Sequence, residues 1–103
     1  MGAAFLAELA SAPEAERIKL LEAKVRELTA RVLRLDAAAI DANTPFKALG
    51  LDSLMGLELR NRLEATLGLR LSPTLLWTYG TTRALVGVLA ERMFGDASAG
   101  GKD

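Results

Sequence analysis

Hydrophobic residues recur at alternating steps of three and four along the first third of the chain, which predicts an amphipathic helix starting near Pro13. The apolar positions are Ile18, Leu21, Val25, Leu28, Val32 and Leu35, and charged residues fill the opposite face. The pattern stops at Asp36. A stripe of this length is short for a coiled-coil seam, so it favours a helix that packs in the core. Residues 1–12 are rich in Ala and form either a short helix or the end of a linker.

A second apolar stripe predicts a helix over residues 53–67, ending at Gly68 because glycine readily takes the left-handed conformation that terminates helices. The positions expected in the core step by four: Leu59, Leu63 and Leu67. Leu54 and Leu57 lie on a neighbouring face, so each either packs in the core or faces outward.

The remaining C-terminal segment predicts one short helical turn, a final helix and a tail. Residues 69–82 contain Pro73 and Gly80 around a small apolar cluster, which suits a single turn. Thr81 or Thr82 can cap the final helix, whose apolar residues are Leu85, Val86, Leu89 and Met93. Residues 95–103 are mostly Gly, Ser, Ala and charged residues, and we expect a flexible tail there.

The connection over residues 36–52 is unusually long for a compact domain. Structureless loops of this length are uncommon and are usually functional or disordered. Apolar residues recur along it as possible anchors: Ile40, Phe46, Leu49 and Leu51. These anchors favour a loop that is ordered and functional.

Composition agrees with this pattern and narrows the function. Half of the 103 residues are hydrophobic and 5% are aromatic, which favours one all-α domain. We expect a bundle of three main helices plus one short helix, with a long first loop and domain bounds of 13–94. The chain has no Cys and no His, so disulfides, the usual zinc sites and His- or Cys-based catalysis are excluded.

Charge and hydropathy argue against two classes of partner. Lys plus Arg and Asp plus Glu each number 13, so the chain lacks the basic excess that is typical of nucleic-acid-binding domains. The longest uncharged stretch, residues 71–82, contains Pro73 and is too short to span a bilayer. No basic residue precedes Arg17, so we expect no secretory signal. A cytoplasmic protein without membrane or nucleic-acid partners, monomeric when excised, is predicted.

The strongest candidate site is residues 49–54, which read LGLDSL. A glycine turn delivers Asp52 and then Ser53 to the start of a helix. Asp52 can accept hydrogen bonds from the backbone of the first turn, and an anion attached to Ser53 would be favoured at the positive end of the helix dipole. On these residues alone, an ordinary Asp-Ser helix cap is the favoured interpretation, because Asp and Ser are common at helix starts.

The longer run over residues 49–62, LGLDSLMGLELRNR, closely resembles the attachment motif of acyl carrier domains from type I modular polyketide synthases. Residues 44–49 resemble the loop before that motif, and residues 5–17 resemble the linker that precedes such domains. Residues 71–81 resemble the later segment that usually reads Phe-Asp-Tyr-Pro-Thr near its end. Trp77, Thr78 and Gly80 stand where Phe, Asp and Pro are commoner. These departures concern the short helix and not the attachment chemistry.

The resemblance implies a non-catalytic carrier with no metal and no catalytic residue. Ser53 would be esterified by 4′-phosphopantetheine, donated by coenzyme A through a separate phosphopantetheinyl transferase. The thiol of that arm would hold acyl intermediates as thioesters and present them to acyltransferase, ketosynthase and processing domains. The residues expected to recognise partners lie around the arm: Asp52, Leu54, Met55, Leu57 and Glu58.

Several alternatives stay open from the sequence. A peptidyl carrier domain of a nonribosomal peptide synthetase would use the same chemistry at Ser53, and a helical interaction module would carry no prosthetic group. A DNA-binding domain is disfavoured by the zero net charge. The arginines at 60, 62 and 70 form either a charged patch or a solvated surface. Trp77 and Tyr79 either pack or contact the arm or its cargo.

Overall fold

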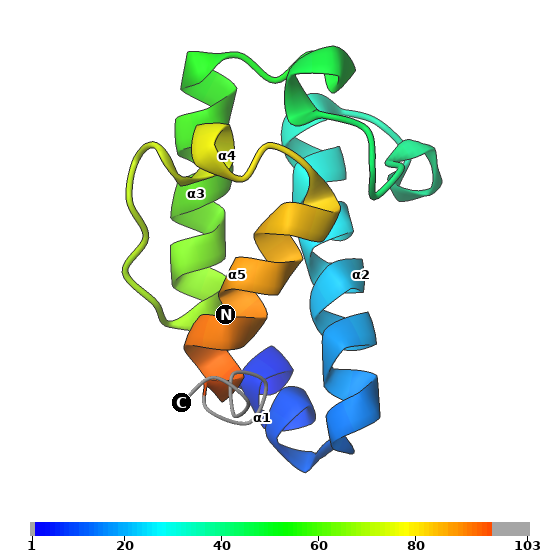
Figure 1. Cartoon of the computed structure of the whole chain (residues 1–103), viewed down its shortest axis with the longest axis vertical. Helices are drawn as coiled ribbons and strands as arrows, with labels where there is room; N and C mark the ends of the chain where they lie inside the picture. The colour runs from blue at the N-terminus through cyan, green and yellow to red at the C-terminus, as the bar shows by residue number, and fades with distance from the viewer. Residues whose placement is uncertain (1, 96–103) are drawn as a thin grey trace.

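Five α-helices and two short 3-10 helices make up the computed structural model, which describes residues 2–95 (Figure 1). The elements are α1 (Ala3–Ser11), α2 (Glu14–Leu33), η1 (Ala37–Ala39), η2 (Phe46–Leu49), α3 (Ser53–Leu67), α4 (Leu75–Thr78) and α5 (Thr82–Phe94). Helix α3 runs antiparallel to α2, and α4 lies against the first half of α3 (Figure 1). The all-α class and the long first loop are confirmed, and residues 3–11 form the short helix that was one of two alternatives. Apart from Gly95, the predicted tail lies outside the described residues.

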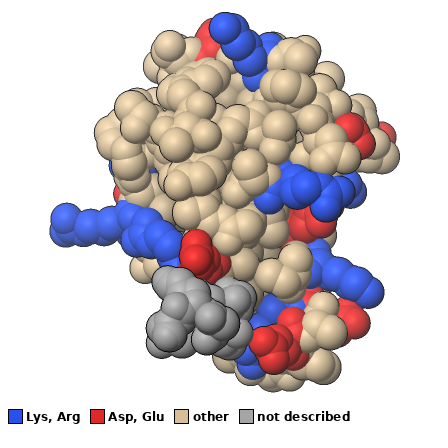
Figure 2. Space-filling view, in the orientation of Figure 1, with Lys and Arg blue, Asp and Glu red and all other residues tan. Residues whose placement is uncertain are grey.

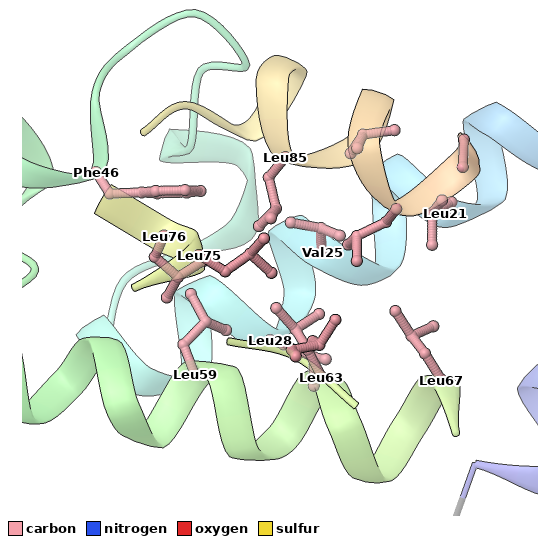
Figure 3. Close-up of a cluster of buried hydrophobic side chains, with 14 of the residues drawn as sticks. Leu21, Val25, Leu28, Phe46, Leu59, Leu63, Leu67, Leu75, Leu76 and Leu85 are labelled. Carbon is pink, nitrogen blue, oxygen red and sulfur yellow. The ribbon is translucent and has the colours of Figure 1, made fainter. Parts of the chain in front are cut away.

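The core lies between α2, α3 and α5, where leucines from each helix meet (Figure 3). The predicted positions Leu59, Leu63 and Leu67 on α3 are at most 3% exposed, which confirms them as core. They pack in one cluster with α2 residues such as Val25, and Phe46 from the loop caps the cluster at one end. These buried apolar side chains supply most of the driving force for folding.

The apolar stripe of α2 is longer than the core that it covers. Ile18 and Leu35 are each 41% exposed, so the prediction that they belong to the core face was wrong. Helix α2 ends at Leu33 because Arg34 takes a left-handed conformation with φ 60°, which carries Leu35 off the helical face. Ile18 lies one turn before Leu21, the first buried residue of α2.

Helix α1 is docked onto the bundle. Phe5 and Leu9 are buried in the same core cluster as α2 and α3. A Cβ atom added at Gly2, the residue before α1, would clash with the Thr66 carbonyl oxygen, so the close approach of this end of α1 to α3 depends on glycine. The Arg17 Nε donates to the carbonyl oxygens of Leu9 and Ala12, each at 3.1 Å, and holds the end of α1 to α2. The domain boundary at residue 13 stays a prediction.

The long connection is fastened to the start of α5. The Phe46 N–H donates to the Gly80 carbonyl at 2.8 Å, and Arg83 Nε donates to Asn43 Oδ1 at 2.7 Å. The predicted anchors are confirmed, because three are buried and the fourth packs partly buried against the core: Ile40, Phe46, Leu51 and Leu49. This attachment holds the loop in one place immediately before α3 begins.

Candidate functional site

Asp52 and Ser53 lie where the fastened loop enters α3. Gly50 has a φ of 103°, which only glycine adopts readily, and this turn sets the direction of residues 51 and 52. Asp52 Oδ1 accepts a hydrogen bond from the Met55 N–H at 2.8 Å, so the predicted cap of α3 is confirmed. Ser53 is the first residue of this 15-residue helix. Its side chain is exposed and its hydroxyl has no hydrogen-bond partner within residues 2–95.

An open surface pocket of about 500 Å³ adjoins Ser53 and is lined by Lys47, Leu51, Asp52, Ser53 and Trp77. The loop supplies Lys47 through η2, and α4 supplies Trp77. Sequence reasoning did not single out Lys47, because a lone lysine in a turn carries no signal of its own. Figure 2 shows that the surface around α4 carries few charged side chains, whereas Lys, Arg, Asp and Glu gather elsewhere on this face.

Trp77 lies over the beginning of α3 and is 42% exposed. A Cβ atom built on Gly56 would come within 3.0 Å of the indole Cζ2, so the absence of a side chain at this position lets the ring lie close to the helix. Tyr79, by contrast, packs partly buried against the core. Of the two aromatic residues, Trp77 therefore remains available at the surface beside Ser53.

The predicted recognition residues share the first turns of α3 but differ in exposure. Leu54 is 80% exposed, so its outward orientation is established, and Leu57 is partly buried. Met55 is partly buried against the core cluster, so a charge at this position would disturb packing as well as any contact with a partner. Glu58 is exposed and its Oε2 accepts from Arg62 Nη2 at 3.0 Å. Leu54 is therefore the best position at which to probe partner contact.

Arg60 belongs to the framework of the fold and not to a surface patch. Its Nη1 donates to the Leu71 carbonyl at 3.2 Å and lies 3.0 Å from Glu64 Oε2, and the Arg60 side chain is only 19% exposed. The Leu71 N–H donates to Glu64 Oε2 at 2.7 Å. These contacts tie α3 to the loop that leads to α4, and so they help to place Trp77.

The hydrogen bond from the Leu71 backbone, followed by the attraction of Arg60, lowers the pKa of Glu64 below its ordinary value. A lowered pKa in the folded state means that Glu64 stabilises the fold above its ordinary pKa, and that this contribution is lost as pH falls through the lowered value. We predict that Glu64→Gln reduces the free energy of unfolding at neutral pH, and that the deficit shrinks on acidification. Denaturant titrations of the unaltered protein and of Glu64→Gln, from neutral pH to below the ordinary pKa of a glutamate, measure this difference in the free energy of unfolding.

Glu91→Gln, at an exposed position of α5, is the control for the loss of one negative charge. A Glu64→Gln deficit that stays constant from neutral pH to well below the ordinary pKa would contradict the role given to the carboxylate.

Membrane-spanning helices and metal-binding clusters are both absent from the described part of the chain. No helix within residues 2–95 has the length and apolar character needed to cross a membrane. In the same residues, no three acidic, His or Cys side chains gather in a way that could hold a metal ion.

Residues 23–89, well over half of the chain, match the family described as "Phosphopantetheine attachment site". The chain is 52% identical over 85 residues to the spectinabilin polyketide synthase system protein NorC of Streptomyces orinoci, a match that covers 82% of this chain and 4% of that protein. The chain thus spans a small fraction of the length of this relative.

Solved carrier structures share the fold. An A1-type ACP domain from module 5 of MLSA1 matches with a TM-score of 0.78 and 32% identity, covering 90% of this chain and 94% of that one. A free-standing peptidyl carrier protein from Acinetobacter baumannii matches with a TM-score of 0.70 and 36% identity, covering 73% and 94%.

Since acyl and peptidyl carriers share this fold, the sequence relatives distinguish them, and the higher identity is to a polyketide synthase protein. The match to the attachment-site family decides against two alternatives that the sequence left open, an interaction module without a prosthetic group and a DNA-binding domain. Members of this family are non-catalytic carriers whose prosthetic group is phosphopantetheine. The chain belongs to the phosphopantetheine attachment site family and is an acyl carrier domain of the polyketide synthase type.

Proposed function

We propose that Ser53 is the residue that carries the 4′-phosphopantetheine arm. The observation that supports this most directly is its exposed hydroxyl at the first position of α3, beside an open pocket. The site fits a phosphate ester, because the positive end of a 15-residue helix and the Lys47 ammonium both favour an anion there. Asp52 caps the helix, which leaves the Ser53 hydroxyl free for chemistry.

The attachment is a phosphoryl transfer from coenzyme A. The Ser53 oxygen attacks the phosphorus that bears pantetheine and forms a new O–P bond, while the P–O bond of the pyrophosphate breaks and adenosine 3′,5′-bisphosphate leaves. The serine proton passes to a base of the phosphopantetheinyl transferase, since the neighbouring Asp52 carboxylate already accepts the capping hydrogen bond from the Met55 N–H. When bound, the arm supplies a thiol that holds an acyl group as a thioester, which a chain without Cys otherwise lacks.

The domain would then act as a shuttle inside a larger synthase. The chain corresponds to only 4% of the polyketide synthase protein that it resembles, and we propose acyltransferase, ketosynthase and processing domains as its partners. Tethering raises the effective concentration of such partners to about the millimolar range, so each contact can be weak and brief. A cytoplasmic location and a monomeric state for the excised domain are part of this proposal.

Loading is tested with the purified chain, coenzyme A, Mg²⁺ and a phosphopantetheinyl transferase of broad specificity. Intact mass spectrometry should show the addition of one phosphopantetheinyl group, and peptide mapping should locate it on Ser53. An unmodified mass on folded protein, with a known carrier loaded in a parallel reaction, would overturn the proposal.

A further prediction concerns contact between Leu54 and a partner domain. Because this side chain is 80% exposed beside Ser53, Leu54→Glu should slow acyl transfer from a partner acyltransferase while leaving the thermal melt almost unchanged. Transfer rates to the loaded protein, measured with radiolabelled or mass-tagged acyl groups, test this. Ile18→Glu is the matched control, since it places the same charge on an exposed apolar residue of another helix. Equal rates for both variants with every partner domain would remove Leu54 from the recognition surface.

A further inference from the structure

The pocket beside Ser53 joins one cation and one aromatic ring, and both have unused hydrogen-bonding capacity. Lys47 and Trp77 line it together with Ser53. Within residues 2–95, the Lys47 ammonium forms no ion pair and the indole N–H of Trp77 donates no hydrogen bond. Leu51 contributes an apolar wall, although most of its side chain is buried. The pocket therefore offers a positive charge, a flat apolar surface and one free donor, side by side.

These features match the chemistry of a phosphopantetheine arm, taken in the order in which its groups follow the serine oxygen along the arm. The phosphodiester comes first and keeps one negative charge, for which an ammonium is a favourable neighbour. Next comes a segment with two methyl groups, followed by amides whose carbonyl oxygens accept hydrogen bonds. The Asp52 carboxylate is the one acidic group that lines the pocket. Its negative charge repels the phosphodiester, and the positive charge of Lys47 offsets this repulsion.

Trp77 is held in a suitable position for contact with the arm. One side of its indole lies close to α3 at Gly56, and at 42% exposure the ring still presents surface to the solvent. A flat aromatic side chain with few rotatable bonds loses little conformational entropy when it forms a contact. A contact at this ring therefore costs little in ordering.

We infer that the arm on Ser53 folds back into this pocket when no partner holds it, with Lys47 beside the phosphodiester and Trp77 against the methyl-bearing segment. The inference rests on the proposed function, because it requires the arm to be on Ser53. An exposed ion pair of this kind changes the ratio of docked to free arm by only roughly 1.4- to 5-fold. The arm is thus sheltered at rest but is easily drawn out by a partner domain.

Trp77 is the single tryptophan of the chain, so it reports on the pocket without interference. The loaded protein, with loading first verified by intact mass, should show a smaller acrylamide quenching constant for tryptophan fluorescence than the unloaded protein. Nuclear Overhauser effects should connect the indole protons with the two methyl groups of the arm. A loaded protein that shows unchanged quenching and none of these effects would overturn the inference and leave the proposed function intact.

The role of Lys47 is tested by Lys47→Gln, with Lys19→Gln as the matched control. Lys19 is also exposed but lies on α2, outside the pocket. In the loaded Lys47→Gln protein, the protection of Trp77 from quenching should be weaker, whereas Lys19→Gln should behave as the unaltered protein does. Molar salt should weaken the protection in the unaltered protein as well, because it shortens the screening length to about 3 Å. Equal protection in both variants would remove Lys47 from the docked arm.

Discussion

Replacing Ser53 with alanine should abolish loading by coenzyme A completely. No neighbouring side chain can substitute for the nucleophile, since the nearest earlier hydroxyl, on Thr44, lies in the loop and donates to Asp41 Oδ2 at 3.0 Å. Stability should change by no more than about 1 kcal/mol, the scale of a lost helix cap, because Asp52 and not Ser53 makes the capping bond. Intact mass after incubation with transferase and a circular dichroism melt measure the two effects together.

Ser11→Ala is the matched control, since Ser11 is an exposed serine on α1 and should leave loading unchanged. Ser53→Cys should also fail to load, because the transferase forms an oxygen ester of the phosphate and not a bond to sulfur. Loading retained in Ser53→Ala would move the attachment site to another residue. A collapsed melt in that variant would return Ser53 to a structural role in the helix start.

Truncating Leu63 to alanine should produce the largest loss of stability among the substitutions considered. Its side chain is 0% exposed and packs in the core cluster between α2, α3 and α5. Removing it costs the transfer free energy of the lost Cγ and its two methyl groups and leaves a cavity, which together amount to about 2–5 kcal/mol. The free energy of unfolding from denaturant titration measures the loss.

Leu54→Ala is the control, because it deletes the same atoms from a side chain on the same helix that is 80% exposed. Its effect should lie within about 0.5 kcal/mol. A midpoint for Leu63→Ala that coincides with that of Leu54→Ala would show that α3 packs through another face. The pair therefore tests the orientation of α3, on which the outward direction of the recognition residues depends.

Local rules in the sequence were enough to locate α3 and the start of α5, although they carried the apolar stripe of α2 past its end at Leu33 and left α1 undecided. Asp52 and Thr81 cap α3 and α5, and Gly68 ends α3 in the left-handed conformation. Each signal acts within one helical turn, through a side-chain oxygen and a nearby N–H or through the conformational freedom of glycine. The position of Ser53 at a helix start, and the core positions spaced by four on α3, follow from such local rules. The resemblance of residues 49–62 to a carrier motif indicated the family.

Tertiary structure decided which side chains of the site meet and which face outward. Leu54 and Met55 are adjacent in the chain, yet one is exposed and the other packs against the core, because the direction of α3 depends on its neighbours. Lys47 and Trp77 reach the same pocket from segments 30 residues apart in numbering, brought together by the bonds that fasten the loop to the start of α5. Side-chain periodicity describes a single helix, whereas these placements depend on contacts between distant segments, which no local pattern encodes.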